Sequence, residues 1–220
     1  MMTRVPEPEL MVDEAQALAY AEADFDEPHT MYVDLLVERV GELSGRVLDL
    51  GCGPGDIVRR VAQRFKSAHI DAVEGAAAMA TLARQMAGKW GLGGQVTVRH
   101  LYLPTDQLGE RRYDAVISNS LLHHLNAPRV LWETLARCAG PGARVFIMDL
   151  LRPDSREAAQ ALVDCYADGE PEVLRRDFFN SLLAAYRLEE VKDQLTEAGL
   201  AELQLEQVSD RHWVVYGALN

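Results

Sequence analysis

The sequence has few cysteines, an excess of acids over bases and no long hydrophobic run. Three of its 220 residues are cysteines, and no two of them form a CxxC pair. Scattered cysteines are typical of reduced thiols, so we expect neither disulfides nor a metal site. No apolar run reaches the roughly eighteen residues that a membrane-spanning helix needs, and the first residues lack the apolar core of a signal peptide. We therefore expect a soluble, cytoplasmic protein without a membrane partner.

The charge balance restricts the partners further. Lysine and arginine number 22 against 34 acidic residues, for a net charge of −12. This balance disfavours nucleic acid as a partner, because sequence-independent binding relies on clustered lysine and arginine side chains. At 48% hydrophobic residues, the chain can form one domain with a full core. We expect an N-terminal helical cap at 1–44 and a main domain at 45–220 with a helical insert at about 154–186. The oligomeric state stays open, a homodimer included.

Strand-like and helix-like segments alternate from Arg46 onward, which predicts an α/β fold with a parallel sheet. The predicted strands are 46–50, 69–74, 95–101, 113–119 and 143–150, the last of them after a Gly-Pro-Gly turn at 140–142. Two further strands, 201–208 and 211–217, are joined by Ser209-Asp210. A link this short predicts a hairpin, so the last strand should run antiparallel to its neighbour. Amphipathic helices are predicted at 11–25 and 30–43.

Three glycines follow the first predicted strand, in "VLDLGCGPGD" at 47–56. Ligands of open parallel sheets bind beyond the carboxyl ends of the strands, where glycine lets them approach the main chain. The spacing is GxGxG, and Asp56 stands where a dinucleotide-binding loop has its third glycine. A carboxylate beside a pyrophosphate is unfavourable, and Asp49 adds a second acid. The loop therefore favours a positively charged ligand without a diphosphate.

Glu74 ends the second predicted strand, where an acid accepts hydrogen bonds from ribose hydroxyls. A nucleoside with a cationic tail and no phosphate describes S-adenosylmethionine. The alternatives are a nicotinamide dehydrogenase, which would need the GxGxxG spacing that is absent, and a module that binds the cofactor without turnover.

Four segments occur in an order and spacing that resemble the class I S-adenosylmethionine-dependent methyltransferases of the Rossmann-like, small-molecule type: "VLDLGCGPGD", "AVEGAAAMATLAR", "YDAVISNSLLHHL" and "PGARVFIMDL". The match is close over residues 46–150. It implies a seven-stranded, mostly parallel sheet of order 3-2-1-4-5-7-6 with the last strand antiparallel, helices on both faces and an N-terminal helical lid. It also implies S-adenosylmethionine as cofactor and S-adenosylhomocysteine as product.

The resemblance and the residues together predict a set of cofactor contacts. These are Asp49, Gly51, Cys52, Gly53, Gly55, Glu74, Leu101 and Asn119. One departure from the family concerns the adenine. Members often carry an acid after the third strand, whereas this chain has "RHLYLP". We expect Leu101 or Tyr102 to line the adenine by packing and backbone contacts instead.

Methyl transfer from a sulfonium is an in-line displacement, so the protein mainly aligns the donor and the acceptor. A general base is needed only when the acceptor must lose a proton. His123 and His124 follow the fourth strand and are candidates for that base. Neighbours on a helical turn point about 100° apart, so we expect only one of them to face the site. The alternative for each is a packing or capping role.

Residues from four segments are candidates for substrate binding: Tyr20, Arg152, Tyr186, Arg211 and His212. Tyr20 belongs to the predicted lid, which would exclude water from the site. The alternative role for the two tyrosines is core packing. Arg152 could instead form a surface ion pair, and the segment before the last strand could simply form a tight turn. We expect a small-molecule acceptor. An RNA or protein methyltransferase is the alternative that the acidic charge and the covering helical segments make less favourable.

Overall fold

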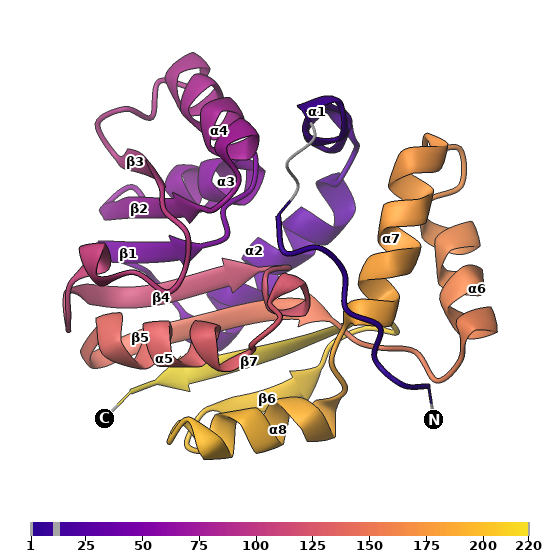
Figure 1. Cartoon of the computed structure of the whole chain (residues 1–220). Coiled ribbons are helices and arrows are strands. Elements are labelled where there is room, and N and C mark those ends of the chain that lie inside the picture. The colour runs from indigo at the N-terminus through magenta and orange to yellow at the C-terminus, as the bar shows by residue number, and fades with distance from the viewer. Residues whose placement is uncertain (1, 11–13, 220) are drawn as a thin grey trace.

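The computed structural model describes residues 2–10 and 14–219, which form one seven-stranded sheet with helices on both faces (Figure 1). The strands are β1 (Gly45–Leu50), β2 (Ala68–Glu74), β3 (Val96–His100), β4 (Tyr113–Asn119), β5 (Ala139–Leu150), β6 (Gln204–Gln207) and β7 (His212–Ala218). Their order is β3-β2-β1-β4-β5-β7-β6. Strands β1 to β5 pair in parallel, and β7 runs antiparallel to both β5 and β6. The predicted fold class and strand order are confirmed.

Helices cover the two faces of the sheet unequally. The helices are α1 (Glu14–Glu22), α2 (Asp26–Val40), α3 (Asp56–Arg64), α4 (Ala77–Lys89), α5 (Arg129–Cys138), α6 (Arg156–Tyr166), α7 (Glu172–Ala184) and α8 (Leu188–Glu197), with short 3-10 turns η1 (Asp106–Leu108) and η2 (Leu122–His124). One core cluster joins α2, α3 and α4 to the sheet, and another joins α5 and α8 to its opposite face. None of the helices in 2–10 and 14–219 is long and apolar enough to cross a membrane.

The two helices of the predicted N-terminal cap lie in different places. Helix α2 packs against the sheet, where the buried ring of Tyr32 meets Phe146 of β5 edge to face at 5.0 Å. Helix α1 lies beyond the carboxyl ends of the strands and packs on the start of α4 through Ala17, Ala76 and Met79. Its first predicted residues, 11–13, lie outside the described residues. The two helices thus separate into one that supports the sheet and one that overhangs its edge.

The predicted turn at 140–142 is wrong, because these residues belong to β5. Ala139 already pairs with Tyr113, and the register with β4 then shifts before Ala115 pairs with Arg144. Gly142 has a φ of 73°, which side chains rarely adopt, and its N–H donates to the carbonyl of Leu219. A glycine here therefore allows the strand to continue through an irregularity where the sequence suggests a break.

Helices α6 and α7 form a separate hairpin beyond the carboxyl ends of the strands (Figure 1). They have a small apolar cluster of their own, with Val163, Leu182 and Leu183 buried. The helical insert predicted at about 154–186 covers the residues of both helices of this hairpin.

Replacing Ser155 by alanine is expected to cost about 1 kcal/mol of unfolding free energy. Ser155 precedes α6, and its hydroxyl accepts a hydrogen bond from the N–H of Ala158 at 3.1 Å. Alanine leaves that N–H without its capping partner. Urea unfolding would measure the loss, with Ser155→Asp as the matched variant that keeps a capping oxygen. Equal losses in both variants would contradict the capping role.

Candidate active site

The glycine loop follows β1 and turns sharply at three positions. Gly51, Gly53 and Gly55 have φ values of 75°, 53° and 97°, all in the left-handed region. The N–H groups of Gly51 and Cys52 both donate to the carbonyl of Val73, at 2.9 and 3.0 Å, which holds the loop against β2. A side chain on Gly53 would meet no atom within 4 Å, so the space beside this stretch of main chain is open.

Glu74 closes the loop from the end of β2. Its carboxylate accepts hydrogen bonds from the N–H of Gly53 at 2.9 Å and from the N–H of Ala76 at 2.7 Å. Burial raises the pKa of this carboxyl, although the main-chain donors oppose the shift. Glu74 therefore fixes the shape of the glycine loop at the place where the sequence predicts a ribose contact.

Asp49 is a buried acid with an unused acceptor. Its exposed fraction is 1%, and its Oδ2 atom has no hydrogen-bond partner in the described structure. Burial, reinforced by the nearby charge of Glu74, raises the pKa of Asp49 to about 7. A buried carboxylate without a partner is costly, so a cationic ligand beside it would be favoured.

The sequence predicts that Asp56 presents a free negative charge to the ligand, but in the structure its carboxylate is paired within the protein. Its carboxylate lies 2.8 Å from Nδ1 of His29 and 2.6 Å from the nearest guanidinium nitrogens of both Arg59 and Arg60. Burial opposes ionisation, but these partners outweigh it and hold the pKa of Asp56 below its usual range. The negative charge of Asp56 is therefore balanced within the protein, and Asp49 and Glu74 remain as the acids near the loop.

A cavity of about 680 Å³ opens over the glycine loop. Seven of the eight predicted cofactor contacts line it: Asp49, Gly51, Cys52, Gly53, Glu74, Leu101 and Asn119. Gly55 faces away, because a side chain there would lie 3.5 Å from the main chain of Ala83 in α4. Gly55 thus packs the start of α3 close to α4 and does not line the cavity. The volume lies within the roughly 300–1,000 Å³ of small-molecule sites.

The N-terminal segment (residues 4–9) contributes Glu9 to the lining of this cavity, and α1 contributes Leu18, Tyr20, Ala21 and Glu22. In Figure 1, α1 lies beyond the ends of the strands, next to α4. Tyr20 lines the cavity, and its ring lies 4.7 Å from that of Phe25. Burial, with the nearby charge of Glu74, raises the pKa of Tyr20 to about 12, so the phenol stays protonated at neutral pH. Leu10 and Leu18 add apolar side chains to the same wall. The acids Glu9, Glu22, Asp24 and Asp26 line it as well, so this wall combines apolar side chains with carboxylates.

The two histidines do not diverge as the sequence suggests. They lie in η2, their ring centroids are 4.2 Å apart, and both rings face the carboxylate of Glu7. Both rings therefore approach the same carboxylate oxygen of Glu7, and they do not point in clearly different directions. His124 lines the cavity, whereas His123 lies behind it, 2.5 Å from Oδ1 of Asp149.

The remaining predicted substrate residues do not line this cavity. Arg152 is buried, donates to the carbonyl of Ala185 and pairs with Glu190 at 2.6 Å, so it does not form the expected surface pair. Tyr186 lies under the guanidinium of Arg4, at 4.3 Å.

Arg211 and His212, at the start of β7, are also buried. The guanidinium of Arg211 stacks on the ring of Tyr166 at 3.3 Å. Nδ1 of His212 lies 3.0 Å from the hydroxyl of Ser209, and burial together with Arg211 lowers the pKa of His212 to about 4. These contacts join the insert and the hairpin to the sheet.

Sequence reasoning missed the N-terminal segment. Arg4 donates to the carbonyls of Ala184 and His123, at 2.6 and 2.8 Å, and Glu9 accepts from the N–H of Asn126 at 2.7 Å. The segment "RVPEPE" has neither helical nor strand periodicity, and its partners are more than a hundred residues away. No local pattern in the sequence could have revealed these contacts.

Comparisons with known proteins agree with this geometry. The family model described as "Methyltransferase domain" matches residues 26–205. An uncharacterized methyltransferase of Mycobacterium tuberculosis is 26% identical over 140 residues, which cover 63% of this chain and 68% of that protein. A ubiquinone biosynthesis O-methyltransferase of Hahella chejuensis is 30% identical over 138 residues, 60% of this chain and 56% of that protein. A solved S-adenosylmethionine-dependent methyltransferase from Aquifex aeolicus superposes with a TM-score of 0.69 at 20% identity, covering 93% and 98% of the two chains.

The chain belongs to the class I, Rossmann-like methyltransferases, enzymes that use S-adenosylmethionine. The residues around the cavity fit this cofactor. The buried Oδ2 atom of Asp49 lacks a partner, the main chain of Gly53 borders open space, and Glu74 stands at the end of β2.

Proposed function

We propose that the protein transfers the methyl group of S-adenosylmethionine to a small-molecule acceptor that binds in the same cavity. One observation carries the proposal: the cavity of about 680 Å³ is lined both by the glycine loop and by residues of α1 and the N-terminal segment. A cavity of this kind suits an acceptor that can enter it whole, and the net charge of −12 disfavours RNA.

In this proposal each wall of the cavity has a role in holding the cofactor. Glu74 accepts hydrogen bonds from the ribose, and Asp49 faces the cationic part of the ligand. Leu101 packs against the adenine, and Asn119 contacts the methionine portion. The support is that all four residues line the cavity.

Bound S-adenosylmethionine supplies an electrophilic methyl group on a good leaving group. The chain's own contribution is then to orient the acceptor and to exclude water. Fixing two reactants in line can contribute roughly 7–11 kcal/mol to lowering the barrier. Leu18, Tyr20 and Phe25 contribute apolar and aromatic surface to the lining of the cavity, which supports the exclusion of water.

A screen of acceptor classes tests the function. Small thiols, amines, phenols and carboxylates would each be incubated with the full chain and S-adenosylmethionine, and the release of S-adenosylhomocysteine would be measured. We expect turnover with at least one class, reduced about 100-fold at limiting cofactor in a Glu74→Ala variant. Methylation of protein or RNA fractions alone, or cofactor binding without any turnover, would overturn the proposal.

A further inference from the structure

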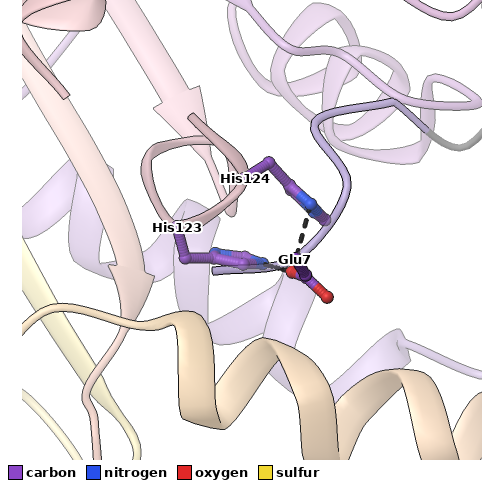
Figure 2. Close-up of side chains that lie close together, drawn as sticks. All are labelled: Glu7, His123 and His124. Carbon is purple, nitrogen blue, oxygen red and sulfur yellow. Dashed lines mark ion pairs between the residues drawn. The ribbon is translucent and has the colours of Figure 1, made fainter. Parts of the chain in front are cut away.

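Glu7, His123 and His124 place three potential metal ligands together at one side of the cavity. Figure 2 shows both imidazole rings turned toward the Glu7 carboxylate. Oε1 of Glu7 lies 3.1 Å from Nδ1 of His124 and 3.5 Å from Nε2 of His123. One ligand atom from each residue lies within 4.8 Å of the others. The prediction that no metal site exists rested on scattered cysteines, and that argument does not apply to a site made of histidine and glutamate.

These separations suit a four-coordinate ion. Zinc bonds to nitrogen and carboxylate oxygen of about 2.0–2.2 Å, in a tetrahedral arrangement, place neighbouring ligand atoms about 3.3–3.6 Å apart. The two distances from Glu7 lie close to that range. The two imidazole nitrogens lie within 4.8 Å of each other, so one ion could bind all three atoms after side-chain adjustment.

Asp149 provides the supporting contact that such a site needs. Its Oδ1 atom lies 2.5 Å from Nδ1 of His123, which leaves Nε2 facing Glu7. The N–H groups of Leu122 and Leu150 donate to Asp149 at 2.6 and 2.7 Å and hold the carboxylate in place. A carboxylate behind a histidine is the usual arrangement at metal centres, because it fixes the ring and makes the other nitrogen more basic.

The local charge also favours a cation. The negative charges of Asp149 and Asp177 lie close enough to Glu7 to interact with its carboxylate electrostatically. The positive charge of Arg4, in the N-terminal segment, lies close enough to interact with His123.

We propose that Glu7, His123 and His124 form a binding site for a divalent transition-metal ion of the zinc class, with its open coordination position facing the cavity. His124 lines the cavity beside Leu121 and Leu125, and 29% of its side chain is exposed. Two imidazoles and one carboxylate select zinc or cobalt over magnesium or calcium, which prefer oxygen ligands. The fourth position can accept water or an oxygen or nitrogen atom of a small molecule. The site goes beyond the proposed function and does not require it.

The competing explanation is a hydrogen-bonded tether without metal. Glu7 also accepts a hydrogen bond from the hydroxyl of Ser181 at 3.0 Å, and the N–H of Val5 donates to the carbonyl of Leu183. In that case the cluster would only hold the N-terminal segment against α7, and the affinity for zinc would not exceed that of a surface histidine.

Metal titration of the chelator-treated full chain separates the two explanations. We expect calorimetry to find one zinc ion bound per chain, and cobalt(II) to give the intense visible absorption of a four-coordinate site, whereas magnesium should not bind. His124→Ala and Glu7→Gln should each lower zinc affinity by at least about 100-fold, and Asp149→Asn by about 10–100-fold. His69→Ala, at an exposed strand position, is the matched control and should bind zinc like the wild type.

The wild-type result decides the question even if a variant fails to fold. Absence of saturable zinc binding, or a cobalt spectrum typical of six-coordinate aqueous ions, would overturn the site. Equal zinc affinity in folded His124→Ala and His69→Ala variants would do the same. Binding of S-adenosylhomocysteine by the metal-free protein, measured in parallel, tests the cofactor site separately.

Discussion

Replacing Glu74 by alanine is expected to weaken the binding of S-adenosylmethionine about 100-fold. The variant loses the acceptor for the N–H groups of Gly53 and Ala76, which the carboxylate holds at 2.9 and 2.7 Å. It also loses the proposed contact with the ribose. A hydrogen bond to a charged group contributes about 1.5–3 kcal/mol, and about 3 kcal/mol corresponds to a 100-fold change in affinity. Calorimetric titration with S-adenosylhomocysteine would measure the loss without turnover.

Two variants control this measurement. Glu74→Gln keeps one acceptor oxygen and should lose about tenfold in affinity, since one of the hydrogen bonds can still form. Glu133→Gln removes an acid from the exposed surface of α5, where 60% of the side chain is accessible, and should bind normally. Wild-type affinity in Glu74→Ala would contradict the role given to this carboxylate.

Ionisation of Asp49 is expected to destabilise the protein free of cofactor by about 4 kcal/mol as the pH rises from about 4 to about 7. The pKa of Asp49 is about 7 in the folded state, against 3.8 for an ordinary aspartate. Between these values the folded state binds more protons than the unfolded state, so stability falls as the pH rises. Each pKa unit corresponds to about 1.4 kcal/mol, and the loss should level off above pH 7.

Urea unfolding of the wild type and of Asp49→Asn at a series of pH values isolates this effect. The difference between the two free energies of unfolding should change by about 1.4 kcal/mol per pH unit between pH 5 and 7. S-adenosylmethionine should bind more tightly as the pH rises through 7, because its sulfonium charge favours the ionised carboxylate. S-adenosylhomocysteine, which lacks that charge, should respond less. A difference between wild type and variant that does not vary with pH would refute the assignment.

The sheet and the glycine loop could be predicted from the sequence because their signals are local. Alternating hydrophobic segments mark β1 to β5, and the glycines that follow β1 lie where the chain must turn at positive φ. Glu74 could be identified from the sequence as a candidate because it lies at a fixed place in the fold, the end of β2. The turn predicted at 140–142 was wrong because glycine occurs in irregular strands as well as in turns.

The contacts of Glu7 and Arg152 could not be predicted, because they depend on pairings between distant parts of the chain. Glu7 meets the histidines of η2 across more than a hundred positions, and Arg152 pairs with Glu190 of α8. Hydrophobic periodicity shows which face of an element is buried but not which polar side chains meet there.

The two sides of the cavity come from separate stretches of the chain, and this separation bears on how its specificity can evolve. The glycine loop and Glu74 belong to the sheet, whereas Leu10, Leu18 and Tyr20 come from chain that precedes the first strand. Substitutions at residues 9, 10, 18 and 20–25 can reshape the space offered to an acceptor while leaving the glycine loop and Glu74 unchanged. A library randomised only at these positions is thus the economical starting point for redirecting the enzyme to new acceptors.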